Sequence, residues 1–115
     1  MQVLVEKVVI HNREGCCWER LRNAEVRVAD QLPASGQEMF SGGALLGTFT
    51  GPGEDGQVVT MTSITGIGGR FVIVQLDHSP GTENLNLNEV TVWGRKQGMP
   101  NIFSQNPLVF WPVSK

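Results

Sequence analysis

The feature that most constrains the fold of this chain is a series of short segments in which apolar and polar side chains alternate. Residues 24–29 show the pattern most clearly, because three apolar residues alternate with Glu25 and Arg27, as in a strand with one buried face. No segment sustains the apolar spacing of an amphipathic helix, and 14 glycines and 6 prolines punctuate the chain. These patterns predict an all-β domain with many turns.

Other segments read as strands of the same domain. In the first, about residues 2–11, the apolar parity changes at Glu6-Lys7, and near residues 85–92 it changes at Asn88-Glu89. Each change predicts a β-bulge, because one extra residue moves the following side chains to the opposite face. We also expect a loop over residues 30–43.

The middle of the chain predicts a hairpin followed by a central strand. Residues 45–50 and 57–64 are separated by the turn-forming sequence GPGEDG, which is typical of a tight connection between paired strands. Residues 66–69 are glycine-rich and are expected to interrupt the strand pattern. Residues 71–76 are apolar on both parities apart from Gln75, as in a strand covered on both faces.

Several short strands separated by turns predict a β-sandwich of jelly-roll or related type rather than a fully closed barrel. The chain has 115 residues, enough for one domain that buries its own core. Residues 106–113 form an apolar run in which Pro107 and Pro112 restrict a strand to an edge position. We expect residues 108–111 to pack on the sandwich, either in the same subunit or on a partner's open edge, which makes a homo-oligomer a possible assembly.

Composition excludes several classes of function. Lysine and arginine number 9 against 11 acidic residues, and the basic residues are scattered, so no nucleic-acid partner is expected. No apolar run reaches the roughly 20 residues of a membrane span, and Glu6 and Lys7 come too early for a signal peptide. No arrangement of catalytic side chains stands out, so we do not expect an enzyme.

The candidate functional stretch is residues 11–28, in which Arg13 and Arg20 bracket the adjacent pair Cys16-Cys17. A disulfide between sequence neighbours is strained and closes no loop, so it adds little stability. It would offer a rigid apolar sulfur surface, and the guanidinium groups would offer fixed hydrogen-bond donors, a combination that suits a sugar. The alternative is two reduced thiols and two solvated arginines on a turn.

Three blocks of sequence, in order, carry a resemblance to a known family. The first contains Arg13, Cys16, Cys17 and Arg20 and continues as Leu21, Ala24, Glu25, Val26, Arg27 and Val28; the second is Gly69-Arg70-Phe71-Val72; the third contains Leu85, Leu87, Glu89, Val90, Val92 and Gly94. Over about residues 8–94 the chain resembles the F-type lectin (fucolectin) family of discoidin-like jelly rolls, without that family's N-terminal portion. The resemblance implies a sandwich over residues 1–94, followed by an extension over residues 95–115.

For function, the resemblance implies an extracellular lectin that binds fucosylated glycans. Arg13 and Arg20 would donate hydrogen bonds to the ring oxygen and hydroxyls of L-fucose, and a Cys16–Cys17 disulfide would pack against the ring. Trp18 would add a stacking face or serve in packing. The alternative is a lectin-like scaffold that no longer binds sugar and acts as a protein interaction or oligomerisation module.

This chain departs from the family pattern in and around the expected site. Gly15 stands where the family has an aspartate, although Glu14 and Glu19 are near enough to orient an arginine instead. The family's pocket histidine lies upstream of this chain, so His11 either approaches the pocket from its strand or is a surface histidine. Of the family's calcium ligands Glu89 is present, so calcium is expected only if other ligands complete that site.

Overall fold

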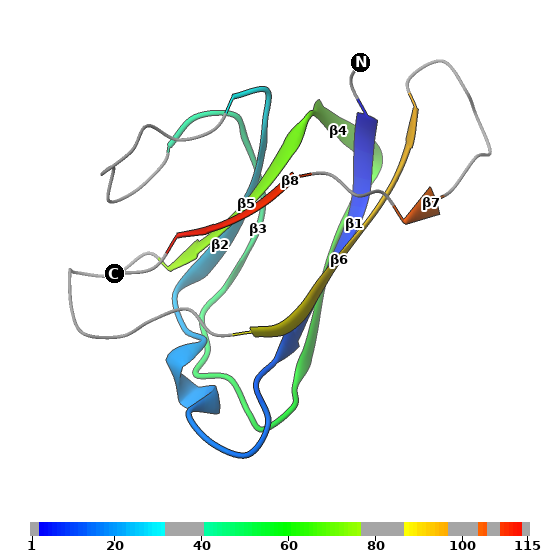
Figure 1. The fold of residues 1–115 in the computed structure, drawn as a ribbon. Coiled ribbons are helices and arrows are strands. Elements are labelled where there is room, and N and C mark those ends of the chain that lie inside the picture. Colours follow the sequence, from blue (N-terminus) through cyan, green and yellow to red (C-terminus); the bar gives the residue numbers. More distant parts are fainter. Residues whose placement is uncertain (1–2, 32–40, 77–86, 97–103, 106–108, 114–115) are drawn as a thin grey trace.

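In the part of the chain that the structure describes, alternating apolar and polar residues form eight strands, and one short 3₁₀ turn lies between the first two. The computed structural model describes residues 3–31, 41–76, 87–96, 104–105 and 109–113 (Figure 1). The elements are β1 (Val3–Asn12), η1 (Trp18–Arg20), β2 (Ala24–Ala29), β3 (Ala44–Phe49), β4 (Val58–Gly69), β5 (Phe71–Leu76), β6 (Leu87–Lys96), β7 (Ser104–Gln105) and β8 (Val109–Val113).

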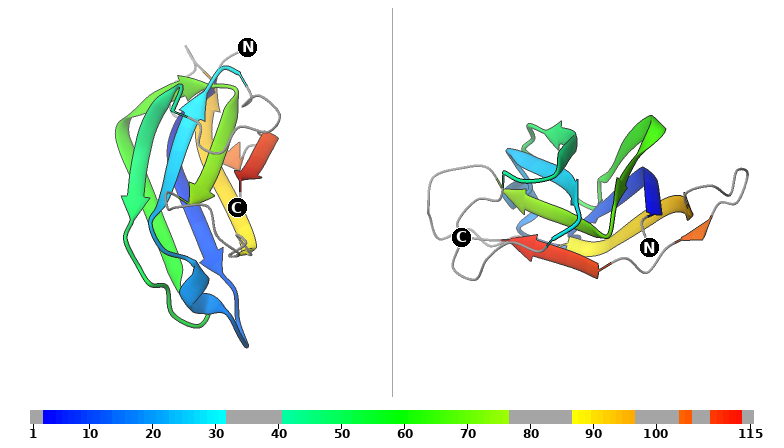
Figure 2. Two further views of the ribbon diagram at one scale, coloured as in Figure 1. Left: turned by 90° about the vertical axis from the view of Figure 1, so that its left-hand side faces the viewer. Right: turned by 90° about the horizontal axis from the view of Figure 1, so that it is seen from above.

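The strands form two four-stranded sheets with the orders β4-β1-β6-β7 and β3-β2-β5-β8, called sheet A and sheet B below. All described pairings are antiparallel except that of β5 with β8, which is parallel. The two sheets lie against each other as layers (Figures 1 and 2). The predicted all-β sandwich is confirmed.

The core lies between the sheets and consists mainly of β-branched residues, whose stiff side chains pack well on a pleated surface. Side chains of alternate parity point into it from both sheets. Its fully buried members include Val5, Val8 and Ile10 of β1, Val26 and Val28 of β2, and Val72 and Val74 of β5.

The bulge predicted in the first strand is confirmed, and it has a larger counterpart on β4. The register of the β1–β4 pairing shifts between Val5, which pairs with Ile67, and Lys7, which pairs with Thr62. Glu6 is the single β1 residue between these pairs, whereas β4 has four residues there. The extra residues protrude, so that Ile64 is 97% exposed. The interruption expected at residues 66–69 is wrong, because β4 continues as a strand to Gly69.

The predicted hairpin of residues 45–50 and 57–64 is also wrong. The two segments correspond to β3 and β4, which belong to different sheets. The chain between them, residues 50–57, crosses from sheet B to sheet A at one end of the sandwich. The backbone of residues 50–57 forms hydrogen bonds with the segment after β1 and does not close a two-stranded turn. For example, the Gly53 N–H donates to the Leu21 carbonyl at 2.8 Å.

The remaining strand predictions match the described residues. β2 and β5 have the expected bounds, and β5 lies between β2 and β8 with every residue after Phe71 buried. The register of the β1–β6 pairing shifts at Asn88, because His11 pairs with Glu89 whereas the next residue, Asn12, pairs with Leu87. This shift is the bulge predicted at Asn88-Glu89. The apolar run near the C-terminus contains β8 at the edge of sheet B, whereas its predicted packing residue Leu108 lies outside the described residues.

The described residues include no helix with the length and apolarity of a membrane span. Their one helical element is η1, a single turn of three residues.

Candidate functional site

The site is built on the buried asparagine that ends β1. Asn12 is 1% exposed, and its side-chain amide donates to the carbonyl oxygens of Trp18 and Glu54, both at 2.9 Å. The first carbonyl belongs to the turn of residues 13–23 and the second to the loop of residues 50–57. One amide group therefore fixes both segments to the end of sheet A. Below, residues 13–23 are called the basic turn and residues 50–57 are called the crossing loop.

The two segments also bond to each other directly beside the first arginine. The Gly56 N–H donates to the Arg13 carbonyl at 3.1 Å, and the Gly15 N–H donates to Asp55 Oδ1 at 3.0 Å. Gly15 stands where the resembled family has an aspartate, and here a carboxylate from the crossing loop reaches the same point of the turn. These bonds hold the backbone on both sides of Glu14.

The far end of the basic turn is anchored by Leu21, whose side chain is buried in the core. Gly53 packs closely there, because a Cβ built on it would lie 2.6 Å from Asn12 Nδ2 and 3.0 Å from the Trp18 carbonyl oxygen. A side chain at this position has no room without displacing the anchoring amide. The crossing loop can therefore approach the turn only with glycine at residue 53.

Between these anchors the turn adopts backbone conformations that most residues avoid. Gly15 has φ 89° and Cys17 has φ 66°, and the left-handed region costs a residue with a β-carbon about 1–2 kcal/mol. Cys17 precedes η1 and leaves Cys16 exposed at the tip of the turn. Residues held in this region cluster at binding and catalytic sites, because the surrounding structure must impose the conformation.

Arg13, Cys16, Cys17 and Arg20 all lie in the basic turn. Both cysteines are free thiols, and the hydrogen bond between their side chains raises the pKa of Cys16 above its usual value. The positive charges of Arg13 and Arg20 act on the same pKa in the opposite direction.

The guanidinium groups of Arg13 and Arg20 have hydrogen-bond donors that no described residue uses. Both arginines are half-buried, and among the described residues neither guanidinium has a hydrogen bond or an ion pair. The carboxylate of Glu14, which the sequence suggested as an orienting group, instead accepts a hydrogen bond from Asn88 Nδ2 at 3.2 Å. An arginine presents several directed donors, so the turn can bind a ligand rich in oxygen acceptors.

Trp18 and His11, the other two sugar-site candidates, border the turn differently. Trp18 begins η1 and is half-buried, and its carbonyl oxygen accepts the Asn12 bond. His11 is half-buried on the opposite face of β1 from Asn12, and its cross-strand neighbours are Val58 and Glu89. His11 thus lies on the outer face of sheet A beside the turn, where it can approach a ligand only from the side.

Glu89, the candidate calcium ligand, is exposed on β6. Within the described part of the chain, no group of three or more histidine, cysteine, aspartate and glutamate side chains is arranged to hold a metal ion. The cross-strand neighbour of Glu89 on β1 is His11.

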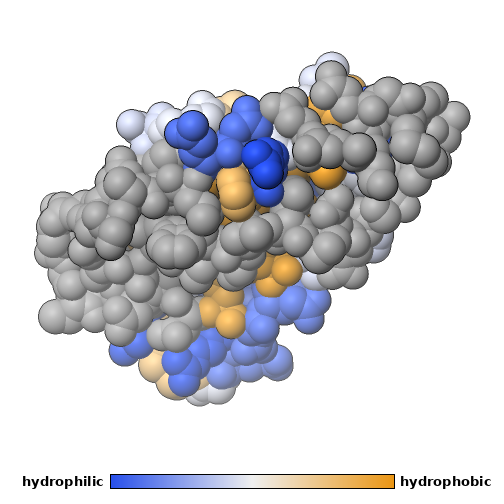
Figure 3. All heavy atoms as spheres, turned by 45° about the horizontal axis from the view of Figure 1, so that its top comes forward, coloured by the Kyte–Doolittle hydropathy of each residue, from blue (hydrophilic) through white to orange (hydrophobic). Residues whose placement is uncertain are grey.

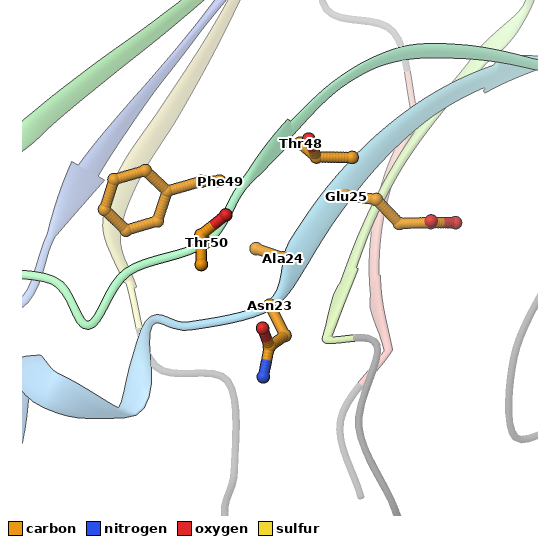
Figure 4. Close-up of a pocket in the computed structure, with 6 residues that line it drawn as sticks. All are labelled: Asn23, Ala24, Glu25, Thr48, Phe49 and Thr50. Carbon is orange, nitrogen blue, oxygen red and sulfur yellow. The ribbon is translucent and has the colours of Figure 1, made fainter.

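A hollow of about 150 Å³ lies beside the basic turn, where β2 begins and β3 ends. Figure 4 shows the residues that line it, with the ring of Phe49 directed toward the core and the side chain of Glu25 directed the other way. The lining residues are Asn23, Ala24, Glu25, Thr48, Phe49 and Thr50.

The sequence indicated the four residues of the turn but missed the groups that position them. Asn12 was detectable, because it continues the buried parity of Val8 and Ile10 and is therefore a polar residue at a core position. Asp55 gave no such signal, since it lies in a turn-forming sequence that predicts a hairpin.

Comparison of the chain with models of protein families, with curated proteins and with solved structures found no match.

Proposed function

We propose that this protein is a carbohydrate-binding domain that recognises fucose-type sugars at the basic turn. The observation that carries the proposal is a pair of half-buried arginines whose guanidinium groups have no partners among the described residues, in one short turn with two cysteines whose side chains interact. A sugar presents hydroxyl and ring oxygens beside patches of C–H surface, and the turn offers donors for the first and sulfur surface for the second. The family resemblance supports the same ligand.

Rigidity of the turn favours binding of a small ligand over a passive surface role. Ordering a loop on binding costs affinity, so a preformed turn retains more of its interaction energy. The Asn12 amide, the Asp55 carboxylate and the buried Leu21 side chain provide that order before any ligand arrives.

Substitution of Arg20 tests the proposal. Arg20→Ala should abolish measurable binding of L-fucose in calorimetric titration, because a charge-assisted hydrogen bond in a binding site contributes about 1.5–3 kcal/mol. Arg20→Lys should also weaken binding at least about tenfold, since an ammonium group cannot bond two oxygens in the planar geometry of a guanidinium.

The matched control is Arg70→Ala. Arg70 is exposed at the opposite end of the sandwich, next to the pairing of Phe71 with Ala29, and its loss should leave fucose affinity unchanged. Equal affinity of the wild type and Arg20→Lys would contradict the proposed contact, and no binding by the wild type would reject fucose as the ligand.

The oxidation state of Cys16 and Cys17 is a separate prediction. We expect purified protein to carry a Cys16–Cys17 disulfide, as the resembled family does, and this predicts a location outside the cytosol. Alkylation in urea without reductant should then add no mass, and alkylation after reduction should add two groups. Uptake of two groups without reduction would show that the thiol pair seen in the structure is the stable form.

The second candidate is an interaction or oligomerisation module. It is favoured by exposed apolar side chains on two edge strands, Leu45 on β3 and Val58 and Ile64 on β4. On the face shown in Figure 3, the hydrophobic residues among those described appear as several small patches. Absence of fucose binding together with a solution mass above that of one chain would favour this candidate.

A further inference from the structure

The strand β4 forms an edge of sheet A that carries none of the residues that usually protect such an edge. One side of β4 pairs with β1, and no strand in the described part of the chain pairs with the other side. The 12 residues of β4, Val58–Gly69, include no charged residue and no proline. Proteins commonly place such residues on free edges, because the open backbone groups of an edge strand pair readily with other chains.

The other described edge strands each have a feature that hinders pairing. β7 has only 2 residues, and β8 contains Pro112, which has no N–H to donate. The register of β3 shifts at Leu46, which has no partner on β2. β4 also bulges, but only beyond Thr62, and its pairing with β1 is regular from Val58 to Thr62. This regular segment is therefore the least protected edge that the structure describes.

The hydrogen bonds of sheet A determine which backbone groups of β4 face the free edge. The Asn12 N–H donates to the Gln57 carbonyl at 2.8 Å, and the same register continues from there along β1 and β4. In an antiparallel ladder, hydrogen-bonded pairs recur at every second residue. Alternate residues of β4 therefore bond to β1. The N–H and C=O groups of the three residues between them, Val58, Thr60 and Thr62, point to the free edge.

These outward backbone groups are complementary to those of a second copy of the strand. When two copies pair antiparallel about a two-fold axis at Thr60, Thr60 lies opposite its own copy and Val58 lies opposite Thr62 of the partner. Every outward N–H of each copy then meets an outward carbonyl of the other. A shift of the register by two residues leaves some of these groups unpaired, and a shift by one residue places outward groups opposite inward ones. One register thus satisfies all of them.

The side chains of the segment also suit pairing with a second copy. Val58, Thr60 and Thr62 are exposed, and β-branched side chains pack well against cross-strand neighbours. The segment carries no charge, so a two-fold axis at Thr60 brings no like charges together on the paired strands. The exposed fraction of Val58, 53%, would fall when the side chain lies beside Thr62 of the partner.

We propose that the protein forms a homodimer through residues 58–62 of β4, which joins the A sheets of two copies into one continuous sheet. The contact uses the same strand in both copies, so each free edge is used once and the assembly closes as a dimer. The basic turn lies at the end of sheet A where β1 ends and β4 begins. The two-fold axis therefore places the two basic turns at opposite ends of the continuous sheet. The dimer does not depend on sugar binding at the turn.

Sedimentation equilibrium of the full chain tests the dimer. Between about 10 μM and about 1 mM protein, the mean mass of the wild type should rise from that of one chain toward that of two. Thr60→Lys should weaken dimerisation at least about tenfold, because it places two like charges side by side at the axis. Since Thr60 is exposed, this variant should keep the circular dichroism spectrum of the wild type.

A charge reversal at the same position makes the test specific. Thr60→Glu alone should also remain monomeric, whereas an equimolar mixture of Thr60→Lys and Thr60→Glu should dimerise, because opposite charges then meet at the axis. The matched control is Thr48→Lys, which makes the same change at an exposed threonine of β3, an edge strand of sheet B. The control should dimerise as the wild type does.

Amide hydrogen exchange locates the contact. At about 1 mM wild type, the N–H groups of Val58, Thr60 and Thr62 should exchange slowly, and in Thr60→Lys they should exchange fast. A wild type that stays monomeric over the whole range, or a charge-reversed mixture that stays monomeric, overturns the dimer. A dimer that persists in Thr60→Lys, or one in which these three amides exchange fast, overturns the role of β4. Absence of fucose binding would reject the sugar site and leave the dimer standing.

Discussion

Deletion of residues 107–115 should unfold the domain or make it precipitate. The deleted segment contains β8, which pairs with β5 from Phe71 opposite Val109 to Gln75 opposite Val113. Without it, the edge of the most buried strand in sheet B becomes an open row of backbone donors and acceptors. Each lost backbone hydrogen bond costs about 0.5–1.5 kcal/mol from a total stability of about 5–15 kcal/mol for a domain.

Thermal unfolding followed by circular dichroism measures the effect. The matched control is deletion of residues 114–115, which leaves all of β8 in place and should keep the transition of the full chain. A deletion of residues 107–115 that remained soluble, monomeric and cooperatively folded at the same temperature would show that β8 contributes nothing to the sandwich. Precipitation would agree with the tendency of open sheet edges to pair with other chains.

The strands were predictable because one physical constraint fixes them. Where one face of a strand is buried, side chains must alternate, and a change of parity then marks a bulge, as at Glu6 and Asn88. β5 was identifiable for the opposite reason, since Val72, Ile73 and Val74 are all buried and a strand covered on both faces has no need to alternate.

Pairing of the strands was harder to predict, because it depends on contacts that are distant in sequence. The turn-forming residues between β3 and β4 suit a hairpin as well as a crossing between sheets. Two long-range hydrogen bonds favour the crossing: the Asn12 amide donates to the Glu54 carbonyl, and the Gly53 N–H donates to the Leu21 carbonyl. Similarly, glycines at residues 66–69 suit a break or a strand, and close packing of Gly69 against Val28 favours the strand.

For the candidate site, the sequence indicated the arginines and cysteines of the basic turn and missed the groups that support them. Two arginines around two cysteines are an unusual local pattern, so a local inspection finds them. The Asp55 bond to Gly15 joins residues separated by 40 positions, and no local pattern announces it. The hollow was missed because Glu25 and Thr48 come together only when β2 and β3 pair.

Asn12→Ala should destabilise the protein by about 1–3 kcal/mol and weaken fucose binding at the same time. Removal of the amide takes away the two 2.9 Å hydrogen bonds to the Trp18 and Glu54 carbonyl oxygens, each worth about 0.5–1.5 kcal/mol, and leaves these oxygens with the backbone N–H groups of Leu21 and Gln57 as donors. The freed turn must then be ordered by the ligand, which lowers affinity. Urea denaturation and calorimetric titration of the same sample measure the two effects.

Asn12→Asp gives a sharper form of the same test, because it keeps the side-chain shape and replaces the donor with a carboxylate that faces two carbonyl oxygens. Its loss of stability at neutral pH should equal or exceed that of Asn12→Ala. The control is Asn88→Ala, which removes an exposed amide with one bond of 3.2 Å to Glu14 and should shift the urea midpoint little. If Asn12→Ala unfolded at the same urea concentration as Asn88→Ala, the basic turn would be held by its own backbone bonds and by Leu21, and the buried amide would be dispensable.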